Sequence, residues 1–233
     1  MTDVPEIGGL SARQHAPATQ RNREPILAVL EAVLPPNGAV LEVSSGTGEH
    51  AVFFAPRLAP RLWLPSDPNP RARASIAAWR DHSPAANLYP PIALNAEDPC
   101  WPVEQSPLPE ALQGLDLKQT PIQAIVNINM IHIAPWTACL GLFAGAARIL
   151  PVGGILYLYG PFRQGGQHTA PSNAAFDDNL RARNPDWGVR DLDEVTAIAA
   201  MHHFSLLKTV AMPANNLSVV FQAIAPLATD LVS

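Results

Sequence analysis

The residues best suited to chemistry lie at 39–50, where a short aliphatic run breaks into the turn Ser44-Ser45-Gly46-Thr47-Gly48. Glycines let the backbone of a turn approach a ligand closely and adopt positive φ. A helix is expected to start after the turn, and the free N–H groups of its first residues would point back toward the turn. Glu42, just before the turn, opposes a pyrophosphate but suits an ammonium group or ribose hydroxyls. The pattern predicts a site for a cationic cofactor that carries a ribose.

Asp67 lies about 20 residues beyond this turn and follows a strand expected at 61–64. A carboxylate at this spacing can accept hydrogen bonds from both hydroxyl groups of a ribose. The alternative interpretation is an N-cap for the next helix. Because Pro68 follows directly and the spacing from the turn matches a ribose acceptor, we favour the ribose interpretation.

His132 lies just beyond the carboxyl end of a strand expected at 122–129. Its unperturbed pKa of about 6.5 lets an imidazole accept a proton at physiological pH, so His132 is the predicted general base. The alternative is a histidine that is hydrogen-bonded into the wall of the pocket. His168, His202 and His203 lack the spacing of a catalytic metal site, and no metal is expected.

Strands alternate with helices along the chain. Apolar runs bounded by Pro, Gly and Asn predict strands at 40–43, 61–64, 88–94, 122–129, 155–159, 205–212 and 217–224. Helical patterns follow at 20–34, after 48, from 70, and at 135–150, 172–183 and 191–202. This order implies a Rossmann-like α/β fold with a seven-stranded, mostly parallel sheet covered on both faces. The short link at 213–216 forces the last strand to run antiparallel, and we expect one domain over residues 1–233.

Residues 41–48 resemble the first motif of class I S-adenosylmethionine-dependent methyltransferases, acidic-x-Gly-x-Gly-x-Gly. Glu42 matches the acidic position, Ser44 replaces the first glycine, and Gly46 and Gly48 match the other two. The resemblance implies the class I methyltransferase fold and S-adenosylmethionine as the cofactor. The residues that it places at the cofactor are Glu42, Ser44, Gly46, Gly48 and Asp67.

Four further runs of sequence narrow the resemblance from the methyltransferase superfamily to one family. Asn-Met-Ile-His-Ile-Ala-Pro-Trp at 129–136, Leu-Tyr-Leu-Tyr-Gly-Pro-Phe at 156–162, Pro-Ser-Asn-Ala-Ala-Phe-Asp at 171–177 and Met-Pro-Ala-Asn-Asn-Leu at 212–217 look like the methyltransferase-like protein 26 family. This family has long been described as a domain of unknown function, and the match runs from about Arg21 to Phe221. The family is assigned as methyltransferase mainly by fold, so the resemblance implies an activity without a substrate.

The resemblance also implies roles near the strand ends. Asn95 stands where the superfamily commonly holds the adenine amino group, with Asp98 as the competing candidate and a simple turn as the alternative. Asn129 would orient the substrate or the methionine part of the cofactor. Trp136 would cover the sulfonium, because an aromatic face attracts a cation, although core packing is equally compatible with this residue.

Two segments are expected to cap the site. In the N-terminal segment 1–36, Asn22 would bind the cofactor, with Arg13 and Arg23 near the cofactor carboxylate; an ordinary solvated helix face is the alternative. Residues 160–190 form a connection too long for a plain loop and are expected to act as a substrate cap. Its candidate substrate-binding residues are Phe162, Asn173, Trp187 and Arg190, and Ser172, Phe176 and Asp177 are further candidates for the same cap.

The composition of the chain limits the classes of partner that it is expected to bind. A net charge of −5 and only 15% charged residues give no broad basic surface for nucleic acid. The two cysteines, Cys100 and Cys139, are far apart and suggest no disulfide framework, which is typical of a reducing cytoplasm. No apolar run reaches the length of a membrane span, and we expect a cytoplasmic protein with no membrane partner.

The leading hypothesis is an S-adenosylmethionine-dependent methyltransferase that transfers a methyl group in line to an N, O or S nucleophile of a small molecule. One alternative is a nicotinamide-dependent oxidoreductase, because Asp67 would serve that ribose equally well, but the turn lacks Gly-x-Gly-x-x-Gly. A second alternative is a catalytically silent binding protein with a methyltransferase fold. The sequence predicts neither the oligomeric state nor the methyl acceptor.

Overall fold

The computed structural model describes residues 12–226. Its α-helices are α1 (Pro17–Val33), α2 (Glu49–Arg57), α3 (Pro70–His82), α4 (Trp136–Ile149), α5 (Pro171–Arg183) and α6 (Leu192–Met201). Its strands are β1 (Ala39–Val43), β2 (Leu62–Ser66), β3 (Ile122–Ile128), β4 (Ile155–Gly160), β5 (Arg163–Gln164), β6 (Gln167–His168), β7 (Phe204–Met212) and β8 (Asn216–Ala223). Short 3-10 helices are η1 (Pro102–Glu104), η2 (Glu110–Leu112), η3 (Met130–His132) and η4 (Pro213–Asn215). None of the helices in this described part is long and apolar enough to cross a membrane.

The central sheet has the strand order β2-β1-β3-β4-β8-β7. Strands β2, β1, β3 and β4 are parallel, whereas β8 runs antiparallel to both β4 and β7. The expected α/β fold with a mostly parallel sheet and an antiparallel last strand is therefore confirmed. The carboxyl ends of the four parallel strands meet at one edge of this sheet.

The sheet has six strands, and the prediction of seven was wrong. The segment at 88–94 joins β2 through the isolated parallel bridges Trp63↔Leu88 and Ser66↔Ile92 and forms no regular strand. Pro90 and Pro91 lie between the two bridges, and a proline nitrogen has no hydrogen to donate to a strand ladder. The segment nevertheless follows the outer edge of β2 and delivers Asn95 beyond it.

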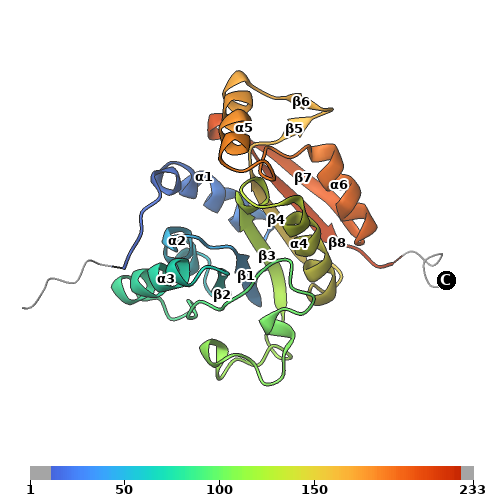
Figure 1. The fold of residues 1–233 in the computed structure, drawn as a ribbon. Helices are drawn as coiled ribbons and strands as arrows, with labels where there is room; N and C mark the ends of the chain where they lie inside the picture. Colours follow the sequence, from blue (N-terminus) through green and yellow to red (C-terminus); the bar gives the residue numbers. More distant parts are fainter. Residues whose placement is uncertain (1–11, 227–233) are drawn as a thin grey trace, which may run out of the picture.

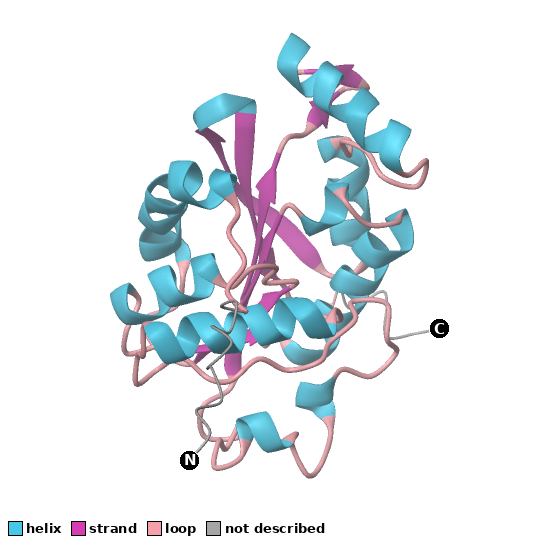
Figure 2. Ribbon diagram, turned by 60° about the vertical axis from the view of Figure 1, so that its left-hand side comes forward, coloured by secondary structure: helices cyan, strands magenta, loops and turns pink. Residues whose placement is uncertain are grey.

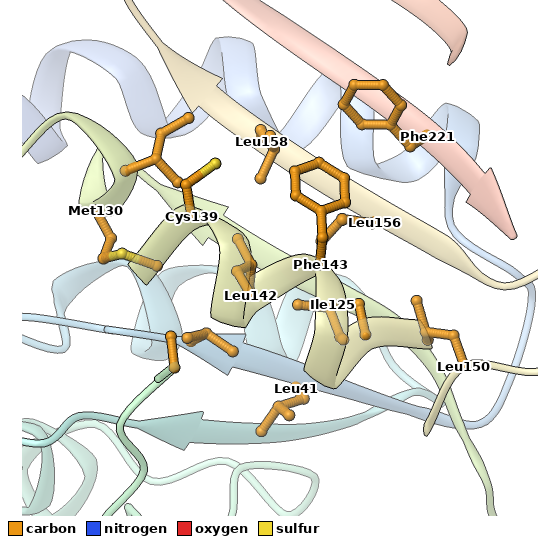
Figure 3. Close-up of a cluster of buried hydrophobic side chains, with 14 of the residues drawn as sticks. Leu41, Ile125, Met130, Cys139, Leu142, Phe143, Leu150, Leu156, Leu158 and Phe221 are labelled. Atoms are coloured by element: carbon orange, nitrogen blue, oxygen red, sulfur yellow. The ribbon is translucent and has the colours of Figure 1, made fainter. Parts of the chain in front are cut away.

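Helices cover both faces of the sheet (Figures 1 and 2). Alternate side chains of each strand enter two separate hydrophobic clusters, so Leu156 and Leu158 pack on one side and Tyr157 and Tyr159 on the other. The first face is covered by α4 and α6 and the second by α1 and α2. Figure 3 shows how α4 lies on the first face, with side chains from both layers in contact: Leu41, Ile125, Cys139, Leu142, Phe143, Leu156, Leu158 and Phe221.

The chain ahead of α1 is fastened to the start of α2. The Glu49 carboxylate, at the first position of α2, accepts hydrogen bonds from the Ala16 N–H at 2.6 Å and the Thr47 hydroxyl at 3.1 Å. Farther back, the Gln14 N–H donates to Ser75 Oγ of α3 at 2.8 Å. These contacts bring α1 beside the Gly-rich turn.

The segment 160–190 folds into the β5–β6 hairpin and α5, which lie together at one end of the sheet (Figure 1). A buried carboxylate, Asp177, ties this segment together. It accepts the Val189 N–H at 2.7 Å and the Arg181 Nε–H at 3.2 Å, and it lies 3.4 Å from the His168 imidazole. These contacts therefore hold α5, the β5–β6 hairpin and the chain at Val189 together.

The Gly-rich turn depends on left-handed backbone geometry. Ser44, Gly46 and Gly48 have φ values of 60°, 58° and 88°. A Cβ atom at Gly48 would lie 2.7 Å from the Cα of Ile76, so the missing side chain lets α2 begin directly against α3. Around Gly46 the space is open, with no atom within 4 Å of such a Cβ.

We expect Gly48→Ala to lower the free energy of unfolding by roughly 3 kcal/mol, because the new methyl group clashes with the α3 backbone and keeps a left-handed φ. Gly46→Ala is the matched control, since it shares the positive φ but meets open space, and it should cost only about 1 kcal/mol. Urea unfolding followed by circular dichroism measures both values. Equal losses in the two variants would contradict the packing role of Gly48.

Candidate functional site

Asp67 fixes the Gly-rich turn to the end of β2. Its Oδ2 accepts the Gly46 N–H at 3.0 Å and its Oδ1 accepts the Asn69 N–H at 2.9 Å, and the residue is only 6% exposed. Burial raises the pKa of this carboxyl group, while the two N–H donors and Arg73 act in the opposite direction. Each carboxylate oxygen keeps a second lone pair, which remains available to hydroxyl groups of a ligand.

Glu42 lies beneath the turn and does not line an open surface. It is 2% exposed, and its Oε2 accepts the indole N–H of Trp63 at 2.9 Å. Burial raises its pKa from 4.5 to about 7, against the opposite effect of the hydrogen bonds from Trp63 and Ser45. This geometry joins β1 to β2 under the turn, so the expected direct contact between Glu42 and the cofactor is not what the structure favours.

A free acceptor lies next to the base of the turn. Asn127 of β3 donates its Nδ2–H to the Val43 carbonyl at 2.9 Å, which fixes the orientation of its amide. Its Oδ1 is buried and has no hydrogen-bond partner among residues 12–226. A buried acceptor that lacks a donor costs free energy, so this oxygen marks an unusual position next to the turn.

A cavity of about 690 Å³ opens at the same edge of the sheet. Its wall combines α1, the ends of β3 and β4, the start of α5 and the link between β7 and β8. Five of the predicted residues meet there: Asn22, Asn129, Ser172, Asn173 and Phe176. The full wall consists of Ala18, Arg21, Asn22, Asn129, Ile133, Tyr159, Pro161, Ser172, Asn173, Phe176, Pro213, Ala214, Asn215 and Asn216.

Asn22 connects this cavity to the turn helix. Its Oδ1 is 2.9 Å from Nε2 of His50 on α2, so the imidazole donates and the amide nitrogen of Asn22 remains for the Tyr159 hydroxyl. Burial lowers the pKa of His50 to about 4, so its ring is neutral near pH 7. Asn22 is thus held by α2 and lies on the cavity wall, which makes it a wall residue and not a solvated helix position.

His132 does not have the geometry of a general base. It is completely buried, packs edge-on against Phe162 and is absent from the described wall of the cavity. Its Nδ1 accepts the Arg190 N–H at 3.4 Å, so the ring proton is on Nε2, which lies buried against Gly160 without a partner among the described residues. Burial, helped by the Arg190 charge, lowers its pKa to about 3. The structure therefore favours a structural histidine, hydrogen-bonded within the protein behind the cavity.

Several predicted substrate residues lie elsewhere. Trp136 and Arg190 line a second cavity of about 480 Å³ on the α4–α6 face, with the guanidinium 5.4 Å from the indole ring. The same guanidinium donates to the carbonyls of Ile131 and Ala134, so it also braces the loop after β3. Trp136 is therefore not placed to cover a ligand in the larger cavity.

Phe162 and Trp187 are also off the wall of the larger cavity. Phe162 is completely buried against His132, and Trp187 lies 5.3 Å from the Arg183 guanidinium on α5. Both positions are part of the packing of the 160–190 segment. Their predicted contact with a substrate came from the length of that segment, which says nothing about the direction of individual side chains.

Asn95, Arg13 and Arg23 are placed by local contacts. The Asn95 Oδ1 accepts the Glu97 N–H at 3.2 Å, which is the turn alternative for this residue. The Arg13 guanidinium lies 5.0 Å from the Trp79 ring and the Arg23 guanidinium 4.5 Å from the Phe53 ring. The two arginines therefore contact α3 and α2.

Sequence reasoning missed Tyr159, Arg21 and Asn127. Tyr159 belongs to the apolar run of β4, so its position at the carboxyl end of a parallel strand was the available signal. Asn127 is the buried polar residue of β3, whose other polar residue, Gln123, is only half-buried, and this is a stronger signal because a buried amide needs partners. The sequence pattern of the helix indicates a solvated position for Arg21, and only the fold places this residue at the rim of the cavity.

A family model described as Protein of unknown function (DUF938) matches residues 13–223. The match covers nearly the whole described part of the chain and includes every residue of the two cavities.

Solved structures of similar fold are methyltransferases. The chain is similar to the S-adenosylmethionine-dependent methyltransferase SibL (TM-score 0.67, 16% identity, 89% of this chain and 56% of that chain covered). It is also similar to human N-acetylserotonin methyltransferase in complex with SAM (TM-score 0.68, 11% identity, 89% of this chain and 53% of that chain covered). A third similar structure is an O-methyltransferase family 2 protein from Planctomyces limnophilus in complex with apigenin (TM-score 0.64, 17% identity, 87% of this chain and 62% of that chain covered). These likenesses show the class I methyltransferase fold, and the chain spans little more than half the length of each of these proteins.

Glu42→Gln tests the buried carboxyl group. Between pH 4.5 and about 7 the folded protein retains a proton that the unfolded chain releases, so the free energy of unfolding falls as pH rises through this range. Glutamine carries no such proton. We expect the difference in unfolding free energy between variant and wild type to shift by about 3 kcal/mol in favour of the variant from about pH 4 to about pH 8. Urea titrations at fixed pH measure this difference, and a pH-independent difference would contradict the burial effect.

Proposed function

This chain belongs to the family described as Protein of unknown function (DUF938), and we propose from its site that it is an S-adenosylmethionine-dependent methyltransferase that acts on a small molecule. The observation that carries the proposal is the buried Asp67 carboxylate, hydrogen-bonded to Gly46 at the carboxyl ends of two adjacent parallel strands. In an open α/β sheet this edge is where ligands bind. The class I methyltransferase fold supports the same interpretation.

The residues around the turn fit the proposed cofactor. Asp67 has free lone pairs for two ribose hydroxyls, and the open space at Gly46 leaves room for a ligand against the backbone. The unsatisfied Oδ1 of Asn127 suits an N–H donor. When it is bound, S-adenosylmethionine supplies an electrophilic methyl group to a nucleophilic atom of the acceptor.

The chain would contribute to the reaction by orienting the two reactants more than by acid or base catalysis. Asn129 lies on the cavity wall directly after β3, and its backbone is held by a hydrogen bond from its N–H to the Tyr159 carbonyl at 2.8 Å. Orientation of two reactants can supply up to about 7–11 kcal/mol of the barrier reduction. We assign no proton transfer to His132, because both ring nitrogens are buried away from the cavity.

We also propose that the whole chain acts as one domain capped by the segments 1–36 and 160–190. Asn22 from the first segment and Asn173 from the second both lie on the cavity wall, which supports this arrangement. Residues 1–11 of the first segment lie outside the described residues. The four sequence runs at 129–136, 156–162, 171–177 and 212–217 support a further proposal, that the chain belongs with the methyltransferase-like protein 26 group.

Asp67→Ala should weaken the binding of S-adenosylhomocysteine on the order of 100-fold, because it removes a charged acceptor for two hydroxyl groups. Isothermal titration calorimetry of the full chain measures this change. Asp81→Ala is the matched control, since it removes the same charge from a side chain that is 76% exposed on α3, and it should bind like wild type.

Three outcomes oppose the proposal. Undiminished affinity in Asp67→Ala would overturn the site assignment, and no binding of S-adenosylhomocysteine to wild type would overturn the cofactor. Tighter binding of NADH than of S-adenosylhomocysteine, measured in the same calorimeter, would favour the oxidoreductase alternative instead.

A further inference from the structure

Asn173, near the start of α5, offers the cavity an acceptor and no donor. Its Nδ2 donates to Thr169 Oγ1 at 3.0 Å and to the Asn215 carbonyl at 2.9 Å, which commits both amide hydrogens. The residue is 4% exposed and lies on the cavity wall, and both hydrogen bonds of its side chain to described residues are made by Nδ2 and none by Oδ1. Since the amide cannot turn over without losing two hydrogen bonds, the carbonyl oxygen is the group that a ligand meets.

Two neighbouring asparagines repeat this pattern. Asn216 donates its Nδ2–H groups to the Pro213 carbonyl at 3.1 Å and the Ala214 carbonyl at 3.4 Å. Asn215 donates to Ser172 Oγ at 3.0 Å. On this side of the wall, Asn173 and Asn216 therefore donate to two partners each inside the protein, and Asn215 donates to one.

Asn129 completes the polar surface from the opposite side. Its φ of 66° is a left-handed value that a residue other than glycine adopts only at a cost, and its side chain makes no hydrogen bond to any described residue. Strained backbone with a free amide, at the end of a parallel strand, is typical of a ligand-binding position.

The wall also includes large apolar side chains that are unusually exposed. Ile133 is 44% and Phe176 is 42% exposed, and both line the cavity. Large apolar side chains gathered in a concave site gain free energy when an apolar ligand covers them. The body of the ligand is therefore apolar.

The wall carries little charge. Among its described residues, Arg21 at the exposed rim is the one charged side chain, and no carboxylate lines the cavity. A cationic amine would meet no counter-charge there, and desolvating it would cost free energy. An anion that faced Asn173 would meet its carbonyl oxygen, and Arg21, the one cationic side chain among the described wall residues, lies at the exposed rim. These constraints select an uncharged ligand.

We propose that this cavity holds an uncharged, apolar acceptor molecule whose N–H or O–H group donates a hydrogen bond to Asn173 Oδ1. The inference rests on the proposed function, because it specifies the methyl acceptor of the same site. It also predicts that a methylated ligand binds more weakly than its precursor where the reacting O or N carries one hydrogen. The methyl group would leave the sulfur of the cofactor, with S-adenosylhomocysteine as the leaving group, and replace that hydrogen, which would pass to water as a proton, so no donor would remain.

Matched probe pairs test this inference without any turnover. Indole and 1-methylindole differ in one N–H donor, and 2-naphthol and 2-methoxynaphthalene differ in one O–H donor. The δ1 methyl group of Ile133, followed by 13C-resolved NMR in the full chain, reports binding in this cavity. The corresponding methyl of Ile198 lines the second cavity and serves as the internal control.

Wild type should bind each donor probe about 10-fold more tightly than its methylated partner, the effect of one hydrogen bond to a buried acceptor. Asn173→Leu should bring the ratio to about 1 while leaving the affinity for 1-methylindole within about twofold. Phe176→Ala should weaken both members of a pair and keep the ratio. The two probe pairs show separately whether an N–H or an O–H donor is preferred.

Equal affinities within both pairs in wild type would overturn the inference, whatever Asn173→Leu does to folding. Shifts at Ile198 without shifts at Ile133 would overturn it as well. A calorimetric titration of the same sample with S-adenosylhomocysteine separates this result from the proposed function. Donor preference without cofactor binding supports the cavity and rejects the methyltransferase, whereas cofactor binding without donor preference does the reverse.

Discussion

The four parallel strands β2, β1, β3 and β4 end at one edge of the sheet, and the candidate site depends on this constraint. The register pairs Val43 with both Ser66 and Asn127, so the residues that follow each strand emerge side by side. The Gly-rich turn follows β1, and Asp67 follows β2. Asn129 follows β3 close to the end of β4. Groups that are distant in sequence become neighbours without any long-range feature beyond strand pairing.

The second requirement is that the helices stay in place above this edge. Glu49 fastens the chain ahead of α1 to the turn helix, and the His50–Asn22 hydrogen bond repeats the connection one helical turn into α1. On the other side, Asp177 fastens α5 to the loop that precedes α6. The cavity therefore lies between two segments that are each held by a buried polar residue, and its walls are fixed before a ligand arrives.

Most of the fold could be predicted from the alternation of apolar runs and helical patterns, because β1 and β4 are buried throughout and β3 is buried except at Gln123 and Ile128. The segment at 88–94 shows the limit. Its composition is apolar enough for a strand, but Pro90 and Pro91 remove the donors that a ladder needs. The hydrophobic pattern reports burial, and the ladder depends on backbone donors that the pattern does not include.

The candidate site, like the fold, could be predicted from the sequence only in part. Asp67 and Asn129 were predictable because their positions at strand ends are set by topology. The direction of a side chain is set by its partners, which come from elsewhere in the chain: Asn173 faces the cavity with its carbonyl because Thr169 and the Asn215 carbonyl bind its amide hydrogens. His132 has the right residue type for catalysis, but burial removes its basicity. Under the proposed function, a wall of neutral amides would leave the reactivity of the acceptor to the acceptor itself, and the protein would contribute orientation and exclusion of water.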